Sequence, residues 1–315
     1  MSKEKSLLER IVTGDRAAIA KAISVVENEE RDAISLLKNI YPHTGKAYRV
    51  GITGPPGAGK STISNKLAKL FRTQKKRVGI IAVDPTSPFT GGALLGDRIR
   101  MTDVELDEGV FIRSMASRGS LGGLSKKAKE AADVLDASGC DIILLETVGV
   151  GQSELDIVRA ADTTVVVLVP ESGDSIQAMK AGLMEIADFF VVNKADRAGA
   201  EQAVMSIKTA LNFRASTNGW SPDVLKSTAY EGEGIDGIAE MIAKHREFLQ
   251  THRLLEGKRK ERLMERIREL IGERLRTEFW NEERQKALVA KMEQVLSQQL
   301  TPYDLAEQLL KSFNK

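Results

Sequence analysis

The feature that most constrains the fold is a series of short, β-branched apolar runs separated by longer amphipathic segments. Most of these runs place apolar residues at consecutive positions, as strands covered on both faces do, and the segments between them suit crossover helices. This alternation predicts an α/β fold with a doubly wound, mainly parallel sheet, whose ligands bind beyond the carboxyl ends of the strands. The predicted strands are RVGITG, RVGIIAVD, VFIRS, CDIILLE, TTVVVLVP and DFFVVNK.

Helical patterns without strand signals flank the alternating region. We therefore expect a helical N-terminal extension over 1–45, an α/β domain over 46–250 and a helical C-terminal arm over 251–315. Thr301 followed by Pro302 predicts the start of the last helix of the arm. A longer helix before it has one apolar face, which could fold back on its own domain or, as we favour, pair with a second copy of the chain. The residues of that face are Leu263, Ile267, Leu270, Ile271 and Leu275.

The composition argues against several classes of function. With 46 basic and 44 acidic residues the net charge is only +2, which gives no whole-chain attraction to nucleic acid or to an anionic membrane. The single cysteine, Cys140, allows no internal disulfide, and the three dispersed histidines lack metal-site spacing. The N-terminus is too charged for a secretory signal, and no apolar run reaches ~18 residues. We expect a cytoplasmic protein with no nucleic-acid or membrane partner.

The strongest chemical signal is the segment GPPGAGKST, which lies between a predicted strand and a predicted helix. It matches the phosphate-binding pattern G-x-x-x-x-G-K-[ST] in the context that the pattern requires. Backbone amides of such a loop surround phosphate oxygens, Lys60 can reach the β- and γ-phosphates, and Ser61 offers a hydroxyl to Mg²⁺. The chain is therefore expected to bind a nucleoside triphosphate. The predicted contact residues are Gly54, Pro55, Pro56, Gly57, Ala58, Gly59, Lys60, Ser61 and Thr62.

A second motif, NKAD, follows the apolar run DFFVV and supplies Asn193, Lys194 and Asp196. It resembles the base-reading N-K-x-D motif of GTPases. A carboxylate can accept hydrogen bonds from both the ring N–H and the exocyclic amine of guanine, a pair of donors that adenine does not present on that edge. The motif therefore favours GTP and GDP over adenine nucleotides. STAYEGEGI resembles the weaker last loop of GTPases, with predicted base contacts at Ser227, Thr228 and Ala229.

Acidic residues follow two of the predicted strands. Asp84 ends RVGIIAVD and Asp97 lies in the Pro- and Gly-rich stretch after it, so both are candidate Mg²⁺ ligands, although Asp-Pro is also a common turn. Glu146 ends CDIILLE, at the place of the Walker B acid, where it could bind Mg²⁺ directly, bind it through water or orient the attacking water. The Gly149 amide could contact the γ-phosphate, and Lys180 is either a cation for charge that develops in hydrolysis or part of an exposed helix.

Several segments together, in this order, resemble the GTPase chaperones of adenosylcobalamin-dependent methylmalonyl-CoA mutase, of the MeaB or ArgK type, in the SIMIBI class of P-loop GTPases. The resemblance covers nearly the whole chain, and its second segment is much more specific than the phosphate-binding loop alone. The segments are GITGPPGAGKST, VDPTSPFTGGALLGDRIRM, FIRSMASRGSLGGLS, ETVGVGQSE and VVNKADR.

This resemblance implies a homodimer, formed through the C-terminal arm, that hydrolyses GTP with Mg²⁺ and binds a cobalamin-dependent acyl-CoA mutase. The nucleotide state would gate loading of the cofactor and guard the mutase against inactivation, and the segment 170–182 would be a switch loop that contacts the mutase. By motif match, the catalytic and metal-binding residues implied are Lys60, Ser61, Asp84, Asp97 and Glu146.

Three other functions fit parts of the sequence. A nickel-delivery GTPase would use the same nucleotide motifs, but a Cys and His cluster is expected for its cargo, and one cysteine with three dispersed histidines does not supply it. A small-molecule kinase would use the phosphate-binding loop to phosphorylate an acceptor instead of hydrolysing GTP in water. A structural protein with a vestigial site is disfavoured because the Gly-Lys-Ser core of the loop is intact.

Overall fold

The computed structural model describes residues 6–84, 104, 106–116, 126–147, 159–170, 182–212 and 219–313. The chain divides into two compact units, Met1–Leu255 and Glu256–Lys315. The first unit contains both the predicted N-terminal extension and the predicted α/β domain, and the described part of the second consists of helices joined by short turns. None of the described helices combines the length and the apolar character needed to cross a lipid bilayer.

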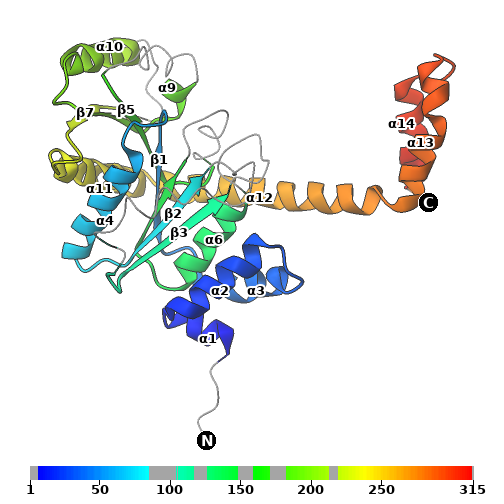
Figure 1. Ribbon diagram of the computed structural model, residues 1–315, viewed down its shortest axis with the longest axis horizontal. Coiled ribbons are helices and arrows are strands. Elements are labelled where there is room, and N and C mark those ends of the chain that lie inside the picture. The colour runs from blue at the N-terminus through cyan, green and yellow to red at the C-terminus, as the bar shows by residue number, and fades with distance from the viewer. Residues whose placement is uncertain are drawn as a thin grey trace, which may run out of the picture. The chain divides into compact units, whose positions relative to one another are not determined.

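In the described residues, seven strands form one parallel sheet in the order β3-β2-β4-β1-β5-β6-β7 (Figure 1). The central strand β1 lies between β4 and β5, so the chain crosses over in opposite directions on its two sides. This topology confirms the predicted doubly wound α/β fold, and it places the loop after β1 at the switch point where such sheets bind ligands. The strands are β1 Tyr48–Thr53, β2 Val78–Asp84, β3 Val110–Ala116, β4 Ile142–Glu146, β5 Thr163–Leu168, β6 Phe189–Asn193 and β7 Val224–Ser227.

The strand β7 was not among the predicted strands. It has four residues, of which only Val224 and Leu225 are apolar, and it lies at the edge of the sheet with Lys226 exposed. Such a short edge strand lacks the run of apolar residues that marks a strand covered on both faces. Its pairing with β6, where Leu225 lies opposite Val191, is a non-local contact that the sequence pattern does not reveal.

Helices cover both faces of the sheet (Figure 1). The helices α4 (Lys60–Thr73) and α11 (Ile235–Thr251) cover one face, where Leu144 of β4 is buried. The helix α6 (Lys126–Ala137) covers β2 and β4 on the other face, where the next residue, Leu145, is buried, and α9 (Leu183–Ile186) and α10 (Ala200–Asn212) cover β5 and β6. Neighbouring residues of one strand thus enter different cores, which explains the consecutive apolar positions in the sequence.

The described part of the N-terminal extension forms three α-helices and a short 3₁₀ helix, so it is helical as predicted. They are α1 Leu7–Val12, α2 Arg16–Glu27, α3 Ala33–Ile40 and η1 Tyr41–His43. Ser6 and Glu9 form a capping box at the start of α1, and Asp15 caps α2. Ile11, Ile19 and Ile23 are buried in the same core as α6. The extension is therefore part of the covering layer of the sheet.

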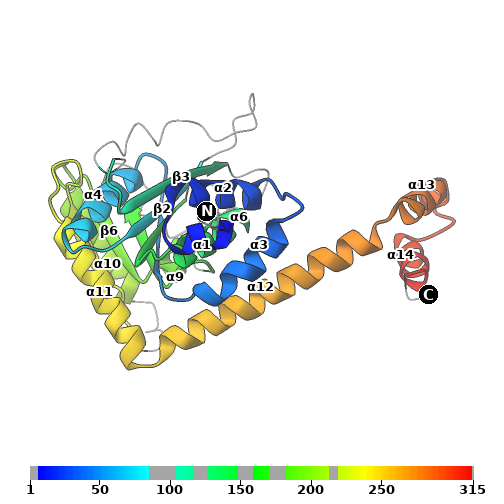
Figure 2. The same cartoon turned by 90° about the horizontal axis from the view of Figure 1, so that it is seen from below.

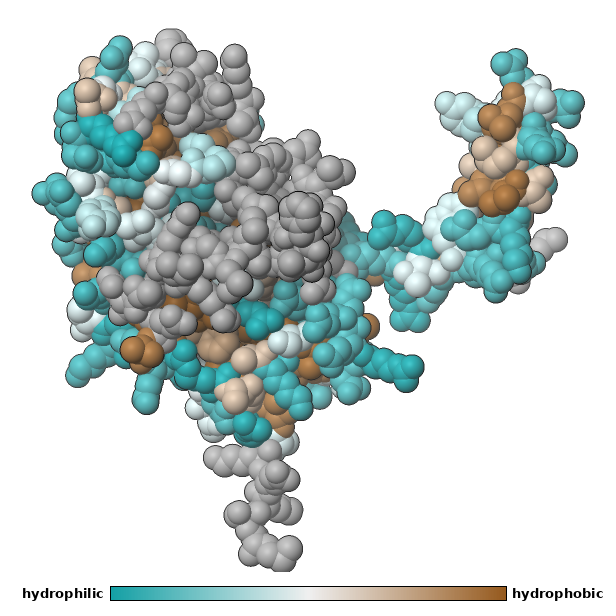
Figure 3. Space-filling view, viewed as in Figure 1, coloured by the Kyte–Doolittle hydropathy of each residue, from teal (hydrophilic) through white to brown (hydrophobic). Residues whose placement is uncertain are grey.

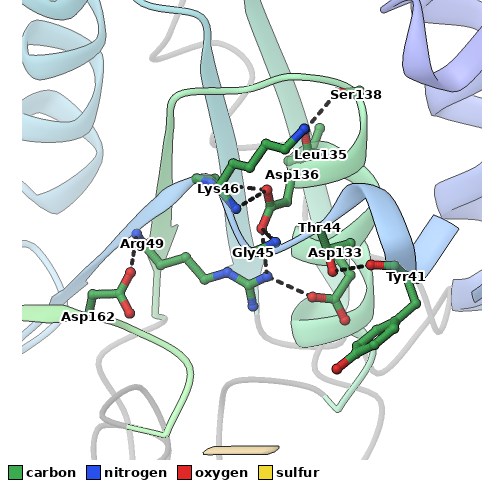
Figure 4. Close-up of polar contacts among 11 residues, drawn as sticks. Tyr41, Thr44, Gly45, Lys46, Arg49, Asp133, Leu135, Asp136, Ser138 and Asp162 are labelled. Atoms are coloured by element: carbon green, nitrogen blue, oxygen red, sulfur yellow. Dashed lines mark hydrogen bonds and ion pairs between the residues drawn. The ribbon is translucent and has the colours of Figure 1, made fainter. Parts of the chain in front are cut away.

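The carboxylate of Asp136, on α6, fixes the segment that leads from the extension into β1 (Figure 4). It accepts hydrogen bonds from the backbone N–H groups of residues 45–47 at 2.8, 3.1 and 3.0 Å. The Arg49 guanidinium lies 2.6 Å from Asp133 and 3.5 Å from Asp136. Burial alone would lower the pKa of Arg49, but these carboxylates outweigh burial and hold that pKa above its usual value. These contacts attach the start of β1 and the segment before it to α6.

The second unit contains most of α12 (Leu254–Phe279), together with α13 (Glu282–Leu296) and α14 (Pro302–Lys311), and Figure 2 shows α12 as one long helix. As predicted, α14 begins after Thr301, whose Oγ1 accepts a hydrogen bond from the Asp304 N–H at 3.1 Å. Arg284 of α13 lies over the rings of Phe279 and Phe313, at 5.4 and 5.1 Å from their centroids. These contacts fix the end of α14 against the junction of α12 and α13.

Candidate nucleotide-binding site

The predicted phosphate-binding loop connects β1 to α4, at the carboxyl edge of the sheet. Gly54 has φ 133° and its backbone passes so close to β5 that a Cβ atom there would lie 2.0 Å from the carbonyl oxygen of Val167. Gly59 caps α4 in the left-handed conformation. The buried Lys60 ammonium donates to the carbonyls of Gly54 and Pro55 at 2.8 and 2.9 Å. A cation and the amino end of a helix therefore meet at the loop, which is the electrostatic environment that phosphate requires.

Glu146 ends β4 and is flanked by Ile52 of β1 and Ala82 of β2. Its side chain is buried, with only 4% exposed, so it is not a solvated strand terminus. Its Oε1 accepts a hydrogen bond from Ser61 Oγ at 2.5 Å, and its Oε2 lies 3.0 Å from Ser64 Oγ. The structure therefore brings the predicted acid, Glu146, into contact with the predicted Mg²⁺-binding hydroxyl of Ser61, although the two residues lie far apart in the sequence.

The other predicted acids and the switch residues lie wholly or partly outside the residues that the structure describes. Asp84 ends β2, two residues beyond the position opposite Glu146, but its side chain lies outside the described residues. Asp97, Gly149 and Lys180 also lie outside them. Among the side chains that the structure describes, no group of three or more His, Cys, Asp or Glu residues could hold a metal ion.

Asn193, at the end of β6, joins two loops of the site. Its Nδ2 donates to the carbonyl of Ala58 in the phosphate-binding loop at 2.8 Å. Its Oδ1 accepts from Ser227 Oγ, at the end of β7, at 3.0 Å and from the N–H of Ala229, two residues further on, at 3.1 Å. Since Asn193 is 97% buried, these contacts are shielded from water. The phosphate loop and the two loops predicted to contact the base therefore form one connected arrangement.

The rest of the NKAD motif turns towards solvent. Lys194 adopts a left-handed conformation with φ 57°, and the next residue, Ala195, donates its N–H to the carbonyl of Ser227 at 3.0 Å. The side chain of Asp196 is exposed. Thr228, which is mostly buried, bridges to Glu233 across the following turn. The loop that carries Asp196 is hydrogen-bonded to the end of β7, and the Asp196 carboxylate itself is exposed. The carboxylate can therefore accept hydrogen bonds from a ligand without first leaving a buried position.

Two features of the site escaped the sequence analysis. The hydroxyls of Thr53 and Thr147, one residue before the phosphate loop and one after Glu146, are buried and 2.8 Å apart. Ser64, which contacts Glu146, follows Ser61 by one helical turn. The helical spacing of the two serines was the available signal for Ser64, whereas the threonine pair depends on strand pairing, which no local pattern encodes.

Comparison with known proteins identifies the family. The family model described as methylmalonyl Co-A mutase-associated GTPase MeaB matches residues 19–284. The chain belongs to this family. The match confirms the resemblance found in the sequence motifs, and the chain is a GTPase, as the phosphate loop and NKAD predicted.

Relatives and a solved structure agree with this assignment. An inferred GTPase of Pyrococcus abyssi is 49% identical over 308 residues, which cover 97% of this chain and 95% of the relative. The mitochondrial methylmalonic aciduria type A homolog of Mus musculus is 34% identical over 334 residues, covering 99% of this chain and 80% of the relative. A crystal structure described as a LAO/AO transport system kinase is similar with a TM-score of 0.75 and 30% identity, and the match covers 98% of this chain and 97% of that one.

Proposed function

We propose that this GTPase is a chaperone of an adenosylcobalamin-dependent acyl-CoA mutase of the methylmalonyl-CoA mutase type. In this role its nucleotide state gates loading of the cofactor, and the complex protects the mutase from inactivation. Membership of the mutase-associated family supports the partner. The observation that best supports nucleotide binding is that Asn193 is hydrogen-bonded to both Ala58 and Ala229. These bonds join the loop proposed to bind the phosphates to the loop proposed to contact the base.

The phosphates are bound by the loop 54–62 and by Lys60. The Lys60 ammonium already lies over this loop, bonded to two neutral carbonyls. A hydrogen bond between an ammonium and an anionic phosphate is roughly twice as strong as one to a neutral acceptor. A small rotation of the side chain towards the β- and γ-phosphates is therefore favourable when a nucleotide enters.

The candidate Mg²⁺ site consists of Ser61, Asp84, Asp97 and Glu146. Their donor atoms are hydroxyl and carboxylate oxygens, which suit a small, hard cation, and the Ser61 hydroxyl and Glu146 carboxylate are already in contact at 2.5 Å. When bound, Mg²⁺ would neutralise charge on the phosphates during hydrolysis. In the same proposal the Gly149 amide contacts the γ-phosphate.

The switch segment 170–182 would supply the link between nucleotide state and mutase. Lys180 lies in this segment and would provide a cation for the charge that develops on the phosphates. The same segment would contact the mutase, so that one loop senses the nucleotide and reports its state to the partner.

The base is read by Asp196, with Asn193, Lys194 and the backbone of residues 227–229 completing its pocket. Replacing Asp196 by Asn exchanges a carboxylate acceptor for an amide that can accept only one of the two guanine donors. Loss of a hydrogen bond to a charged group costs about 1.5–3 kcal/mol, so GTP should bind roughly 10- to 150-fold more weakly. Calorimetry with GTP measures this change, with Asp32→Asn as the control, because Asp32 is exposed and its side chain makes no capping hydrogen bond at the start of α3. Unchanged GTP affinity in Asp196→Asn would overturn the base assignment.

The chaperone role is tested with a purified adenosylcobalamin-dependent methylmalonyl-CoA mutase. We expect GTP and the wild-type chain together to slow the loss of mutase activity during turnover, and Lys60→Ala to abolish both GTP hydrolysis and this protection. Failure of the wild-type chain to bind or protect the mutase would refute the chaperone role. Release of phosphate from GTP in water alone, over many turnovers, separates this function from that of a small-molecule kinase.

We propose that the C-terminal arm pairs two copies of the chain in a homodimer. The predicted apolar face of α12 is about half exposed, with Ile267 at 55% and Ile271 at 53%. Apolar residues also gather on the hairpin of α13 and α14, as Figure 3 shows, and Leu296 is 77% exposed. An apolar stripe of this extent favours burial against a second chain. Light scattering should give a dimer mass for the wild type and a monomer mass for Ile267→Lys, and a wild-type monomer would contradict the pairing.

A further inference from the structure

Ser64 lies on α4 one turn beyond Ser61, and its side chain is fully buried. Its Oγ is 3.0 Å from Glu146 Oε2 and 3.0 Å from the backbone carbonyl of Lys60. Ser61 Oγ is 2.5 Å from the other oxygen of the same carboxylate. Because residues three apart share a helix face, α4 presents one hydroxyl to each oxygen of Glu146.

The Ser64 hydroxyl has one proton and two acceptors within reach. A serine inside a helix commonly bonds the carbonyl four residues earlier, which is a purely structural contact. An ionised carboxylate is the stronger acceptor, since charge-assisted hydrogen bonds are about twice as strong as neutral ones. The proton therefore goes to Glu146, and Ser64 becomes part of the environment of that acid.

Glutamate needs this second contact more than the aspartate usual at this place would. Its additional methylene adds one rotatable bond between the strand and the carboxylate. A carboxylate held at one oxygen can still turn about the remaining bonds, whereas hydrogen bonds to both oxygens fix its plane. Groups that orient a metal-binding carboxylate in this way typically change metal affinity or activity by about 10- to 100-fold when they are removed.

We propose that Ser64 is a positioning residue for the Mg²⁺ site: its hydrogen bond to Oε2 orients Glu146 for Mg²⁺-dependent binding and hydrolysis of GTP. This inference rests on the proposed role of Glu146, and it adds a residue that no nucleotide motif assigns. It also explains how the longer side chain of glutamate is accommodated at the end of β4, because Ser64 on α4 provides a second hydroxyl for its carboxylate.

The test compares Ser64→Ala with the wild type in three measurements. In Ser64→Ala, we expect the Mg²⁺ concentration for half-maximal GTP hydrolysis to rise by about 10-fold or more. Binding of a fluorescent GDP analogue should weaken in the presence of Mg²⁺ and stay unchanged in EDTA. The thermal midpoint should match that of Ser138→Ala, a control that removes an equally buried serine hydroxyl bonded to a backbone carbonyl away from the site.

Two results would overturn the role of Ser64. One is an Mg²⁺ requirement in Ser64→Ala equal to that of Ser138→Ala, and the other is an equal loss of GDP affinity with and without Mg²⁺, which a packing defect gives. Should the alanine variant not fold, Ser64→Thr and Ser64→Val have nearly the same volume and differ in the hydroxyl, so the threonine variant alone should keep the wild-type Mg²⁺ requirement. A wild-type protein that binds and hydrolyses GTP without regard to Mg²⁺ would instead refute the proposed metal site itself.

Discussion

Gly54→Ala should damage the phosphate-binding loop much more than Gly57→Ala, although both glycines lie in that loop with positive φ. Gly54 has φ 133°, and a Cβ atom there would lie 2.0 Å from the carbonyl oxygen of Val167 and 3.0 Å from its carbonyl carbon. Gly57 has φ 76°, and a Cβ atom there would meet no atom within 4 Å. Both substitutions therefore introduce backbone strain, and only Gly54→Ala adds a collision with the neighbouring strand β5.

The magnitudes follow from these two terms. Placing an L side chain at a positive φ costs about 1–2 kcal/mol, which is the expected loss of unfolding free energy in Gly57→Ala. The collision at Gly54 cannot be relieved by turning a flexible side chain, because Val167 contributes backbone atoms of a strand paired on both sides. Forcing extra volume into a packed site adds roughly 1–3 kcal/mol, which brings Gly54→Ala to about 2–5 kcal/mol.

Thermal and urea unfolding of the two variants measure the difference. For a unit of this size, 1 kcal/mol shifts the thermal midpoint by about 2–4 °C, so Gly54→Ala should unfold at a temperature several degrees below that of Gly57→Ala. GTP should also bind more weakly to Gly54→Ala, since the displaced loop carries the Lys60 ammonium. Equal thermal midpoints in the two variants would show that the close approach to Val167 does not constrain the loop.

Two further predictions concern buried groups. Burial raises the pKa of the Cys140 thiol from 9.0 to about 11, so the native state holds its proton where the unfolded state has lost it. The free energy of unfolding should therefore fall between pH 9 and 11, by roughly 2–3 kcal/mol from this group, and urea titrations of Cys140→Ala should lack that part of the decline. Asn193→Ala removes the bonds to Ala58, Ser227 and Ala229, and it should lower the free energy of unfolding by about 2–4 kcal/mol in the same assay.

The parts of the fold that the sequence predicted are those with local causes. Consecutive apolar residues in β4 enter the two cores on opposite faces of the sheet. The five residues of this strand are therefore enough to predict both the strand and its burial. The phosphate-binding loop is likewise encoded in one stretch, by glycines and by Lys60. The strand β7 and the hydroxyl pair of Thr53 and Thr147 depend on pairing between distant segments, so their own residues do not mark them.

The motifs name candidate residues of the site one by one, but they do not predict the contacts between those residues. NKAD predicted that Asn193 lies near the base, and its amide also holds the phosphate loop at Ala58. The last residue of CDIILLE predicted an acid at the site. In the structure, the carboxylate of Glu146 accepts hydrogen bonds from the hydroxyls of Ser61 and Ser64 on α4. Each motif supplies a residue type, whereas the contacts depend on the order of the strands in the sheet.

Because of that strand order, we expect substitutions of Asn193 and Asp196 to affect nucleotide binding differently, although both residues belong to one motif. Asn193 comes from β6 and bonds the phosphate loop after β1, whereas Asp196 is exposed beyond it. Asp196→Asn should therefore weaken guanine nucleotides while leaving contacts to the phosphates intact. Asn193→Ala should weaken the binding of any nucleoside triphosphate, because the loop that holds the phosphates loses its tie to β6. Measuring GTP and ATP affinity in both variants tests this directly, and a loss confined to GTP in Asn193→Ala would show that the bond to Ala58 does not stabilise the phosphate loop.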